Sequence, residues 1–279
     1  MDLQGVQWRK VAEGILSPEG PAADSAGNVY VVSRWTGRVL RVSPDGQAAE
    51  VVQTGGKPQA VALADDGTVY VADAKNYVLY RLAADGATQP VADAAAGGPL
   101  LGPNDLVIAG PDAIYLTDPG LDMQAPGRVL HVNPRTGEAR ILVEGLLFPN
   151  GVALTDDGRF LLVAESSRHR VLRYPLRDAG LRLGEAEVFY QFDDHYPDGM
   201  AFDAAGNLLV ARHGSGCLEV IDPQGRRIAS APVGGRGCTN CVFGGPDFRT
   251  LYVTEDDQQA LLAARWPVPG QRRFSRSRS

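Results

Sequence analysis

The sequence predicts an all-β protein, a six-bladed β-propeller of four-stranded blades, and three observations carry that prediction. One phrase (a turn, a polar residue, an apolar run, a Gly or Asp turn and a second apolar run) occurs six times in 279 residues. The copies are 40 to 48 residues apart. The apolar runs are short, rich in β-branched residues and bounded by turn residues, which is typical of strands. A repeat of this length built from strands indicates one propeller blade per repeat.

The strands can be placed in order along each repeat. The two apolar runs make the first and second strands, as in PNGVALTDDGRFLLVAE from Pro149. Third strands are expected at Arg38–Val42, Val78–Leu82, Arg128–Val132, Arg170–Tyr174 and Leu218–Ile221. Fourth strands are expected at Ala48–Gln53, Thr88–Asp93, Ala139–Glu144, Ala186–Gln191 and Arg227–Pro232. These strands complete five blades.

The sixth blade lacks a fourth strand of its own. After Leu251–Thr254 and Ala260–Trp266 the chain runs into prolines, while Val6–Glu13 at the other end of the sequence belongs to no repeat. We expect this N-terminal strand to pair into the last blade and close the ring, which removes an exposed sheet edge. Residues 1–270 are therefore predicted to form a single propeller, and residues 271–279, with four arginines, a disordered Arg/Ser tail.

Charge and composition narrow the class of protein. The net charge is −6 even with the basic tail, which argues against a nucleic-acid partner. No signal peptide and no apolar run near 18 residues is present, so we expect a soluble, cytoplasmic protein without a membrane partner. The sequence has three cysteines, Cys217, Cys238 and Cys241. The Cys238-x-x-Cys241 pair has neither a second CxxC nor a βαβ context, which favours plain reduced thiols over zinc or redox chemistry.

The repeat brings distant polar residues to one place. Every inner strand starts at the same end of the channel, so the polar residues of the six copies surround one mouth; they are Glu19, Gln59, Asn104, Asn150, Asp198 and Asn240. Loops on the same face are expected to add pocket-lining side chains, namely Trp35, Asp118, Met123, His169, His195 and His213. The loop from Asp118 to Gly127 is the longest of these and the best candidate for a lid.

Six carboxylates and carboxamides around one axis suggest a cation. Oxygen ligands without His or Cys suit a hard divalent ion, Ca²⁺ above all, with Mg²⁺ or Mn²⁺ possible and Zn²⁺ less favoured. Such an ion can polarise a carbonyl or phosphoryl oxygen, and a carboxylate at the rim can act as general base. The alternative is that these residues cap strand ends by bonding backbone groups, as Asn and Asp often do beside Pro and Gly.

A resemblance to a known family is carried by the phrases SPEGPAAD, GPNDLVIAG with IYLTDP, LFPNGVALTDDGRFLLVAES, YPDGMAFDAAGNLLVA and TNCVFGGPDFRTLYVTE. Together they resemble the gluconolactonase, regucalcin (senescence marker protein) and luciferin-regenerating enzyme family, in particular its bacterial sugar-lactonase-like members. The resemblance implies one divalent cation in the channel, with Glu19, Asn150 and Asp198 as ligands and Asn104 near the metal or the substrate. It also implies that Asp198 is the base or nucleophile. Gly102 stands where animal regucalcins have an Arg that helps to bind the sugar lactone, so their substrates cannot be carried over.

The sequence therefore favours a metal-dependent hydrolase that opens a small-molecule lactone, with Asp198 assisting attack by water. A phosphotriester hydrolase like diisopropylfluorophosphatase is the first alternative. A non-catalytic binding propeller is the second, and a condensing enzyme like strictosidine synthase is a lesser one. The sequence leaves open which lactone is the substrate, which metal is native, and whether the protein is a monomer or a weak dimer.

Overall fold

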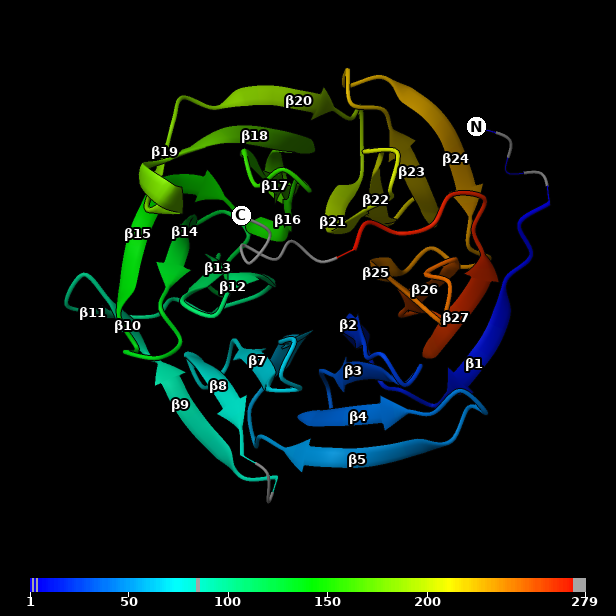
Figure 1. The fold of residues 1–279 in the computed structure, drawn as a ribbon, viewed down its shortest axis with the longest axis horizontal. Helices are drawn as coiled ribbons and strands as arrows, with labels where there is room; N and C mark the ends of the chain where they lie inside the picture. Colours follow the sequence, from blue (N-terminus) through cyan, green and yellow to red (C-terminus); the bar gives the residue numbers. More distant parts are fainter. Residues whose placement is uncertain (2, 4, 84–85, 273–279) are drawn as a thin grey trace.

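Six antiparallel sheets are arranged in a ring around a central channel (Figure 1), which confirms the all-β six-bladed propeller. The computed structural model describes residues 1–272 except residues 2, 4, 84 and 85. The first three blades are β2 (Pro18–Ala23), β3 (Val29–Ser33), β4 (Arg38–Val42) and β5 (Ala48–Gln53); β6 (Pro58–Leu63), β7 (Val69–Asp73), β8 (Val78–Leu82) and β9 (Thr88–Ala92); and β12 (Leu106–Gly110), β13 (Ala113–Asp118), β14 (Pro126–Val132) and β15 (Ala139–Leu147).

The other blades follow the same order from the axis outward. They are β16 (Pro149–Leu154), β17 (Phe160–Glu165), β18 (Arg170–Arg177) and β20 (Glu187–Gln191); β21 (Tyr196–Phe202), β22 (Leu208–His213), β23 (Cys217–Ile221) and β24 (Arg227–Pro232); and β25 (Cys238–Gly244), β26 (Thr250–Glu255) and β27 (Ala260–Arg265). Three short strands were not expected: β10 (Ala94–Ala95) pairs with β11 (Gly98–Pro99), and β19 (Arg182–Leu183) pairs with β18.

The N-terminal strand closes the ring as expected. β1 (Arg9–Glu13) runs antiparallel to β27, with Arg9 opposite Ala263 and Glu13 opposite Ala260, and becomes the outermost strand of the sixth blade (Figure 1). The Trp8 indole N–H donates a hydrogen bond of 2.8 Å to the Pro232 carbonyl, which ties this segment to the fifth blade as well. Residues from both ends of the chain therefore complete one sheet.

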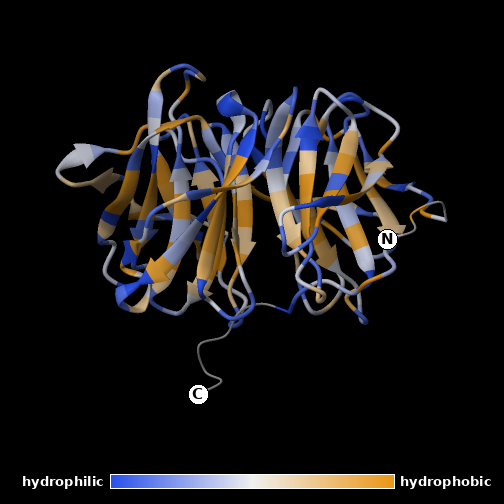
Figure 2. Cartoon of the chain, turned by 90° about the horizontal axis from the view of Figure 1, so that it is seen from above, coloured by the Kyte–Doolittle hydropathy of each residue, from blue (hydrophilic) through white to orange (hydrophobic). Residues whose placement is uncertain are grey.

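The blades are held together by apolar side chains packed between neighbouring sheets. Figure 2 shows the strands as mainly apolar through the middle of the disc, with hydrophilic residues gathered at the loops of both faces. Between the second and third blades, for example, Leu79 packs with Leu116 and Leu130, and all three are fully buried. Burial of one such side chain stabilises the fold by roughly 1.5 to 3 kcal/mol, so each interface between blades is a substantial part of the core.

The segment that follows β27 covers the end of the channel at which the inner strands finish, which we call the lower end. In Figure 1 this segment runs from β27 past β21 towards the axis. The Ala204 N–H donates to the Pro269 carbonyl (2.8 Å), and the Gln271 N–H donates to the Phe202 carbonyl (2.9 Å). The Gln271 side chain reaches further, to the Leu154 carbonyl of the fourth blade (3.1 Å). Gln271 is thus bonded to two blades, and residues 273–279 of the expected tail lie outside the described residues.

Helix is scarce in the part of the chain that the structure describes. It comprises two single 3₁₀ turns, η1 (Ser166–Arg168) and η2 (Asp178–Gly180). No helix among the described residues has the length and apolar character that a membrane span requires.

Candidate functional site

The polar residues at the channel mouth stand on irregular inner strands. In β2, β16 and β21 the pairing with the second strand shifts register directly around the polar residue, between Glu19 and Ala22, Pro149 and Val152, and Pro197 and Met200. A β-bulge bends its strand and changes where a side chain points. These bulges allow Glu19, Asn150 and Asp198 to leave the regular alternation of the sheet, and all three lie at the axial cavity.

The glycine after each of these three residues is required by close contact between blades. A Cβ on Gly151 would lie 2.2 Å from the Asp198 carbonyl oxygen, and one on Gly199 would lie 1.9 Å from the Asn240 side chain. A Cβ on Gly20 would lie 2.1 Å from the Ala60 Cα. Only glycine lets one inner strand approach its neighbour this closely. The Glu-Gly, Asn-Gly and Asp-Gly dipeptides of the repeat therefore set the spacing of the ring.

A cavity of about 240 Å³ lies at this mouth. It is lined by five of the six axial residues, which are Glu19, Gln59, Asn104, Asn150 and Asp198. Apolar and aromatic side chains contribute Leu121, Met123, Phe148 and Tyr196 to the same wall. The sixth axial residue, Asn240, lines a second cavity of about 210 Å³ deeper in the channel. A small, mainly pre-formed cavity with convergent polar groups is the usual form of a small-molecule site.

The two carboxyl groups at the mouth are both buried. Removal from water raises the pKa of Glu19 from 4.5 to about 7, with the nearby Arg34 charge opposing the shift. Burial also raises the pKa of Asp198 well above its usual value, and the negative charge of Glu19 raises it further. Two carboxylates that are desolvated and repel each other hold protons strongly unless a positive charge joins them.

Two oxygen atoms at the mouth lack partners. Asn150 Oδ1 and Asp198 Oδ1 are buried and have no hydrogen-bond partner among the described residues, although the Asn150 side chain is close enough to Asp198 to oppose the rise in its pKa. Buried oxygens without a donor are rare and call for a ligand, an ion or a water. The described residues hold no cluster of three or more His, Cys, Asp and Glu side chains placed to bind a metal. A cation bound at this mouth would combine the two carboxylates with amide or other neutral oxygens, a donor set that suits a hard ion such as Ca²⁺.

One acidic residue beneath the mouth escaped sequence reasoning. Asp105 accepts hydrogen bonds from the Leu106 N–H (2.9 Å) and, across the interface between blades, from the Val152 N–H (3.0 Å). Burial raises the pKa of Asp105 to about 7. Asp105 occupies the place that glycine takes after Glu19, Asn150 and Asp198, and this break in the repeat was the available signal.

Two further expected lining residues lie outside the cavity. Asp118 is fully buried, where it pairs with Arg128 (2.8 Å) and accepts hydrogen bonds from the Leu101 and Gly102 N–H groups. Trp35 is 70% exposed, and the Lys57 ammonium lies 5.2 Å from its ring centroid. Asp118 thus stabilises the Leu101–Gly102 loop at the mouth. Trp35 lies on the surface next to Lys57.

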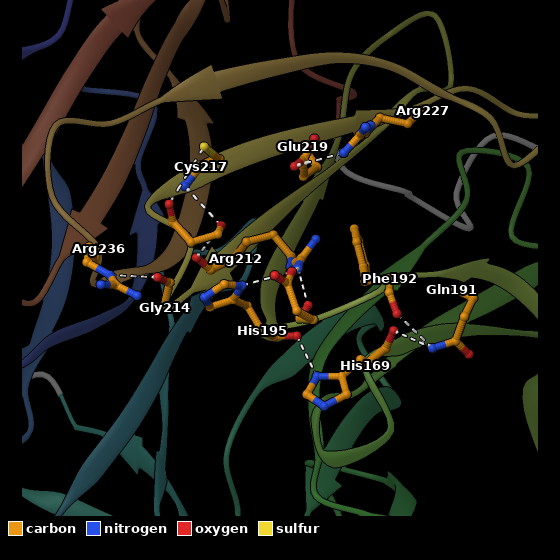
Figure 3. A network of polar contacts seen from close by, with 12 residues as sticks. His169, Gln191, Phe192, His195, Arg212, Gly214, Cys217, Glu219, Arg227 and Arg236 are labelled. Atoms are coloured by element: carbon orange, nitrogen blue, oxygen red, sulfur yellow. Dashed lines mark hydrogen bonds and ion pairs between the residues drawn. The ribbon is translucent and has the colours of Figure 1, made fainter.

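The three candidate histidines separate into two groups. His213 lines the cavity. Figure 3 shows His169 and His195 in a polar network instead, where His169 Nδ1 lies 2.6 Å from the His195 carbonyl oxygen. His195 Nδ1 lies 2.8 Å from Asp194 Oδ1, which Arg212 also contacts at 3.1 Å. This network supports the loop that enters β21, and it places these two rings beside the site rather than in it.

The remaining predicted groups are engaged in local contacts. The Gln59 side chain donates to the Lys57 carbonyl (3.2 Å), and Asn240 Oδ1 accepts from the Cys241 N–H (2.8 Å). Cys238 and Cys241 are buried free thiols, and burial raises the pKa of both well above the usual value. Protonated, buried thiols are poor nucleophiles and poor metal ligands.

The loop after β13, the lid candidate of the sequence, contributes to the cavity wall. Met123 and Leu121 from this loop line the cavity. The Ser167 hydroxyl donates a hydrogen bond of 2.7 Å to the Met123 carbonyl, which links the loop to the fourth blade. Leu121 is 59% exposed, so one side of the loop is in solvent and the other faces the cavity.

The sequence matches one family model and is similar to several known proteins. The model of the family described as "SMP-30/Gluconolactonase/LRE-like region" matches residues 17–256. The chain is 28% identical over 241 residues to the lactonase drp35 of Staphylococcus saprophyticus, a match that covers 82% of this chain and 74% of the relative. A 6-deoxy-6-sulfogluconolactonase of Pseudomonas putida is 30% identical over 149 residues, 52% of this chain and 50% of the relative.

Other relatives are matched over a smaller share of their length. Two Arabidopsis thaliana proteins named strictosidine synthase-like 13 and 6 are 33% and 29% identical, and the matches cover 53% and 75% of this chain. The chain spans only 39% and 59% of these two proteins.

Solved structures share the fold. A gluconolactonase from Xanthomonas campestris superimposes with a TM-score of 0.85 at 23% identity, covering 96% of this chain and 91% of the other. A calcium-binding protein named regucalcin from Agrobacterium tumefaciens superimposes with a TM-score of 0.82 at 24% identity, covering 96% of both chains.

Proposed function

The chain belongs to the SMP-30/gluconolactonase/LRE-like family, and on that premise we propose that it is a metal-dependent hydrolase that opens the ring of a small-molecule lactone. Relatives named as lactonases support the reaction class. The observation that carries the proposal is the mouth of the channel, where two buried oxygens without donors, Asn150 Oδ1 and Asp198 Oδ1, meet in a cavity of about 240 Å³.

The donor set fits one divalent cation. Glu19 and Asp198 would supply negative charge, Asn150 would supply its unpartnered amide oxygen, and Asn104 would lie near the ion or the substrate. A divalent ion would also offset the cost of burial that raises the pKa of both acids, and the charge of Glu19 that raises the pKa of Asp198 further. We propose Ca²⁺ as the native ion, with Mg²⁺, Mn²⁺ and Zn²⁺ as candidates to be tested. When bound, the ion supplies polarisation of the lactone carbonyl.

Asp198 is proposed as the general base. Its carboxylate would accept a proton from the attacking water while the water oxygen bonds to the carbonyl carbon. The ring C–O bond then breaks, the ring oxygen takes up the proton that Asp198 had accepted, and the product is an open-chain hydroxy acid. Burial keeps Asp198 out of bulk water, so a proton that it accepts is not lost at once to solvent.

The neighbouring residues are proposed to orient the substrate. The Asn104 N–H is fixed by the Thr117 carbonyl (2.9 Å), which holds the Asn104 side chain at the cavity wall. Leu121, Met123 and Phe148 supply apolar surface that displaces water from the lactone ring. The polar groups would then form hydrogen bonds to the ring oxygen and hydroxyls of the substrate, while the apolar wall would contribute to affinity without distinguishing one lactone from another.

The experiment that tests the proposal combines metal analysis with a lactone panel. Purified protein is stripped with a chelator and loaded with Ca²⁺, Mg²⁺, Mn²⁺ or Zn²⁺. Acid release from γ- and δ-lactones and from diisopropylfluorophosphate is then followed with a pH indicator. We expect lactone turnover that needs one bound ion per chain and is lost on chelation. Turnover of diisopropylfluorophosphate alone would replace the proposal with the first alternative. No bound ion and no turnover would replace it with a binding function.

A further inference from the structure

Two basic side chains line the same cavity as the axial acids. Arg34 lies in the turn between β3 and β4 of the first blade, and Lys57 directly precedes β6 of the second blade, the neighbour of the first in the ring (Figure 1). Their backbones are fixed, since the Arg34 N–H donates to the Ser17 carbonyl (3.1 Å) and the Lys57 N–H donates to Asp73 Oδ1 (2.8 Å). Two cations are therefore held on one wall of a cavity of about 240 Å³.

Neither of these cations is neutralised by the part of the chain that the structure describes. Among those residues, the side chains of Arg34 and Lys57 form no ion pair and no hydrogen bond to a carboxylate, although Lys57 lies over the Trp35 ring. Arg34 Nε is buried and has no hydrogen-bond partner. Partly buried arginines elsewhere in the chain do find acids, as Arg128 does with Asp118 (2.8 Å) and Arg170 with Glu165 (2.6 Å).

The axial acids do not account for the two positive charges. Arg34 is close enough to influence Glu19 and Asp198 but lies beyond ion-pair distance of both. The third acid, Asp105, is directed at the N–H groups of Leu106 and Val152. A divalent ion held by Glu19 and Asp198 would cancel their two charges and leave Arg34 and Lys57 as a surplus of two positive charges in a small cavity. Partly desolvated cations of this kind are stabilised by an anion.

We propose that the substrate is a lactone that carries a second functional group, an anionic carboxylate, sulfonate or phosphate, and that Arg34 and Lys57 bind this group. The inference rests on the proposed function and narrows its substrate class. The planar guanidinium of Arg34 suits two-point binding of an oxyanion, while the Lys57 ammonium acts as a point charge. The anion would then lie on the wall formed by the first and second blades, and the lactone carbonyl at Asp198.

The first test compares matched substrates. The ratio of kcat/KM for 6-phospho-δ-gluconolactone to that for δ-gluconolactone is measured at saturating metal for the wild type and for Arg34→Gln, Lys57→Gln and the double variant. Arg38→Gln is the matched control, because Arg38 belongs to the same hairpin but pairs with Glu50 on the surface (3.1 Å). We expect the wild type to prefer the phosphorylated lactone. The preference should fall about tenfold or more in each single variant and further in the double variant, and it should be unchanged in Arg38→Gln.

The second test needs no turnover and separates the two proposals. Binding of sorbitol 6-phosphate and of sorbitol, neither of which is a lactone, is measured by calorimetry at low and high salt. We expect only the phosphate to bind, more weakly in high salt and in the double variant. If lactones are not hydrolysed but this binding pattern holds, the proposed function fails and the anion site stands. If neutral lactones are hydrolysed as well as anionic ones and the double variant leaves the ratio unchanged, the anion site is overturned. Thermal melting of each variant establishes that it is folded.

Discussion

The two ends of the central channel are built from the same six inner strands and differ in almost every property. At the upper end the strands begin with bulges, glycines and buried acids, and the cavity is open to loops that carry Arg34, Lys57 and Met123. At the lower end the strands finish in apolar residues, and Phe248 and Gln271 lie across the channel. In this propeller, buried oxygens without partners lie at the upper end of the channel, and residues 269–271 form hydrogen bonds to the fourth and fifth blades at the lower end.

Opening the ring is expected to lower the stability of the protein more than any other change, and so to affect both ends of the channel. Deletion of residues 1–13 removes β1 and leaves β27 as an unpaired edge, so we expect aggregation or a melting temperature lowered by roughly ten degrees or more. Differential scanning calorimetry and light scattering measure this. Deletion of residues 1–5 alone, which spares β1 and Trp8, is the control and should melt close to the full chain. Equal stability of the longer deletion would show that β1 does not close the sheet.

Two aspartates of the fifth blade lie at opposite ends of the channel, so the same substitution can be compared at both ends. Asp198→Asn at the upper end keeps an oxygen but loses the charge and the base, so kcat should fall by about 10²-fold or more even with metal bound. Asp203→Asn at the lower end disturbs the hydrogen bonds that Asp203 accepts from Ala205 and Asn207 (2.9 Å each). That change should lower stability by about 1–3 kcal/mol and leave kcat close to wild type.

The two aspartates should also differ in the sign of their effect on stability. Burial and the charge of Glu19 raise the pKa of Asp198, so the uncharged amide introduced by Asp198→Asn should stabilise the metal-free protein at neutral pH. Thermal melting of the metal-free wild type, Asp198→Asn and Asp203→Asn shows whether each substitution raises or lowers stability. If Asp198→Asn retains most of the wild-type kcat at full metal occupancy, Asp198 is not the base.

The pH dependence of stability should report on the buried acids Glu19, Asp105 and Asp198, whose pKa values burial raises. Because burial raises the pKa of Glu19 from 4.5 to about 7, the folded protein binds more protons than the unfolded chain across that window. Stability of the metal-free protein should therefore fall as pH rises from about 4.5 to about 7. Saturating Ca²⁺ should restore it most strongly near pH 7 and above. Glu19→Gln should make the metal-free profile shallower, with the remaining slope coming from Asp105 and Asp198, whereas Glu13→Gln, on the surface, should leave it unchanged. A wild-type profile that rises with pH would contradict the assignment.

The smallest effect is expected at the lower seal. Truncation after Gly270 removes Gln271 and its hydrogen bonds to the Phe202 and Leu154 carbonyls, which should cost about 1–2 kcal/mol. Truncation after Arg272 retains them and should melt like the full chain. Turnover should be the same in both proteins, because the seal is at the opposite end from Asp198. A loss of kcat in the shorter protein would show that the two ends are coupled.

The sequence predicted the strands of the propeller more completely than it predicted the contacts within the site. Spacing and turn chemistry located most strands to within a few residues, and the missing fourth strand of the last blade identified β1 as its partner. The glycines after Glu19, Asn150 and Asp198 could be seen in the sequence, but their contacts with the next blade depend on ring geometry. For the same reason, the sequence could not show that the Arg34 side chain has no acidic partner.

Residues outside the repeat were the hardest to place. His169 and His195 lie in loops of the correct face and Asp118 ends β13 there, but their side chains bond to local backbone and to Asp194 or Arg128. Loop position alone cannot distinguish a side chain that lines the cavity from one that supports its wall. The segment around Pro269 has no apolar period, so its passage under the channel followed from no pattern in the sequence.

The pairing of β1 with β27 also has a consequence for the time course of synthesis. Arg9 and its partner Ala263 are separated by nearly the whole chain. At about 5–20 residues per second, a ribosome needs roughly 12 to 50 s to make the intervening residues. During that interval β1 has emerged without the strand that will cover it, and the first five blades can assemble only as an open ring. The last sheet can therefore form only after β27 has been translated. A nascent chain stalled before that point would expose two unpaired sheet edges.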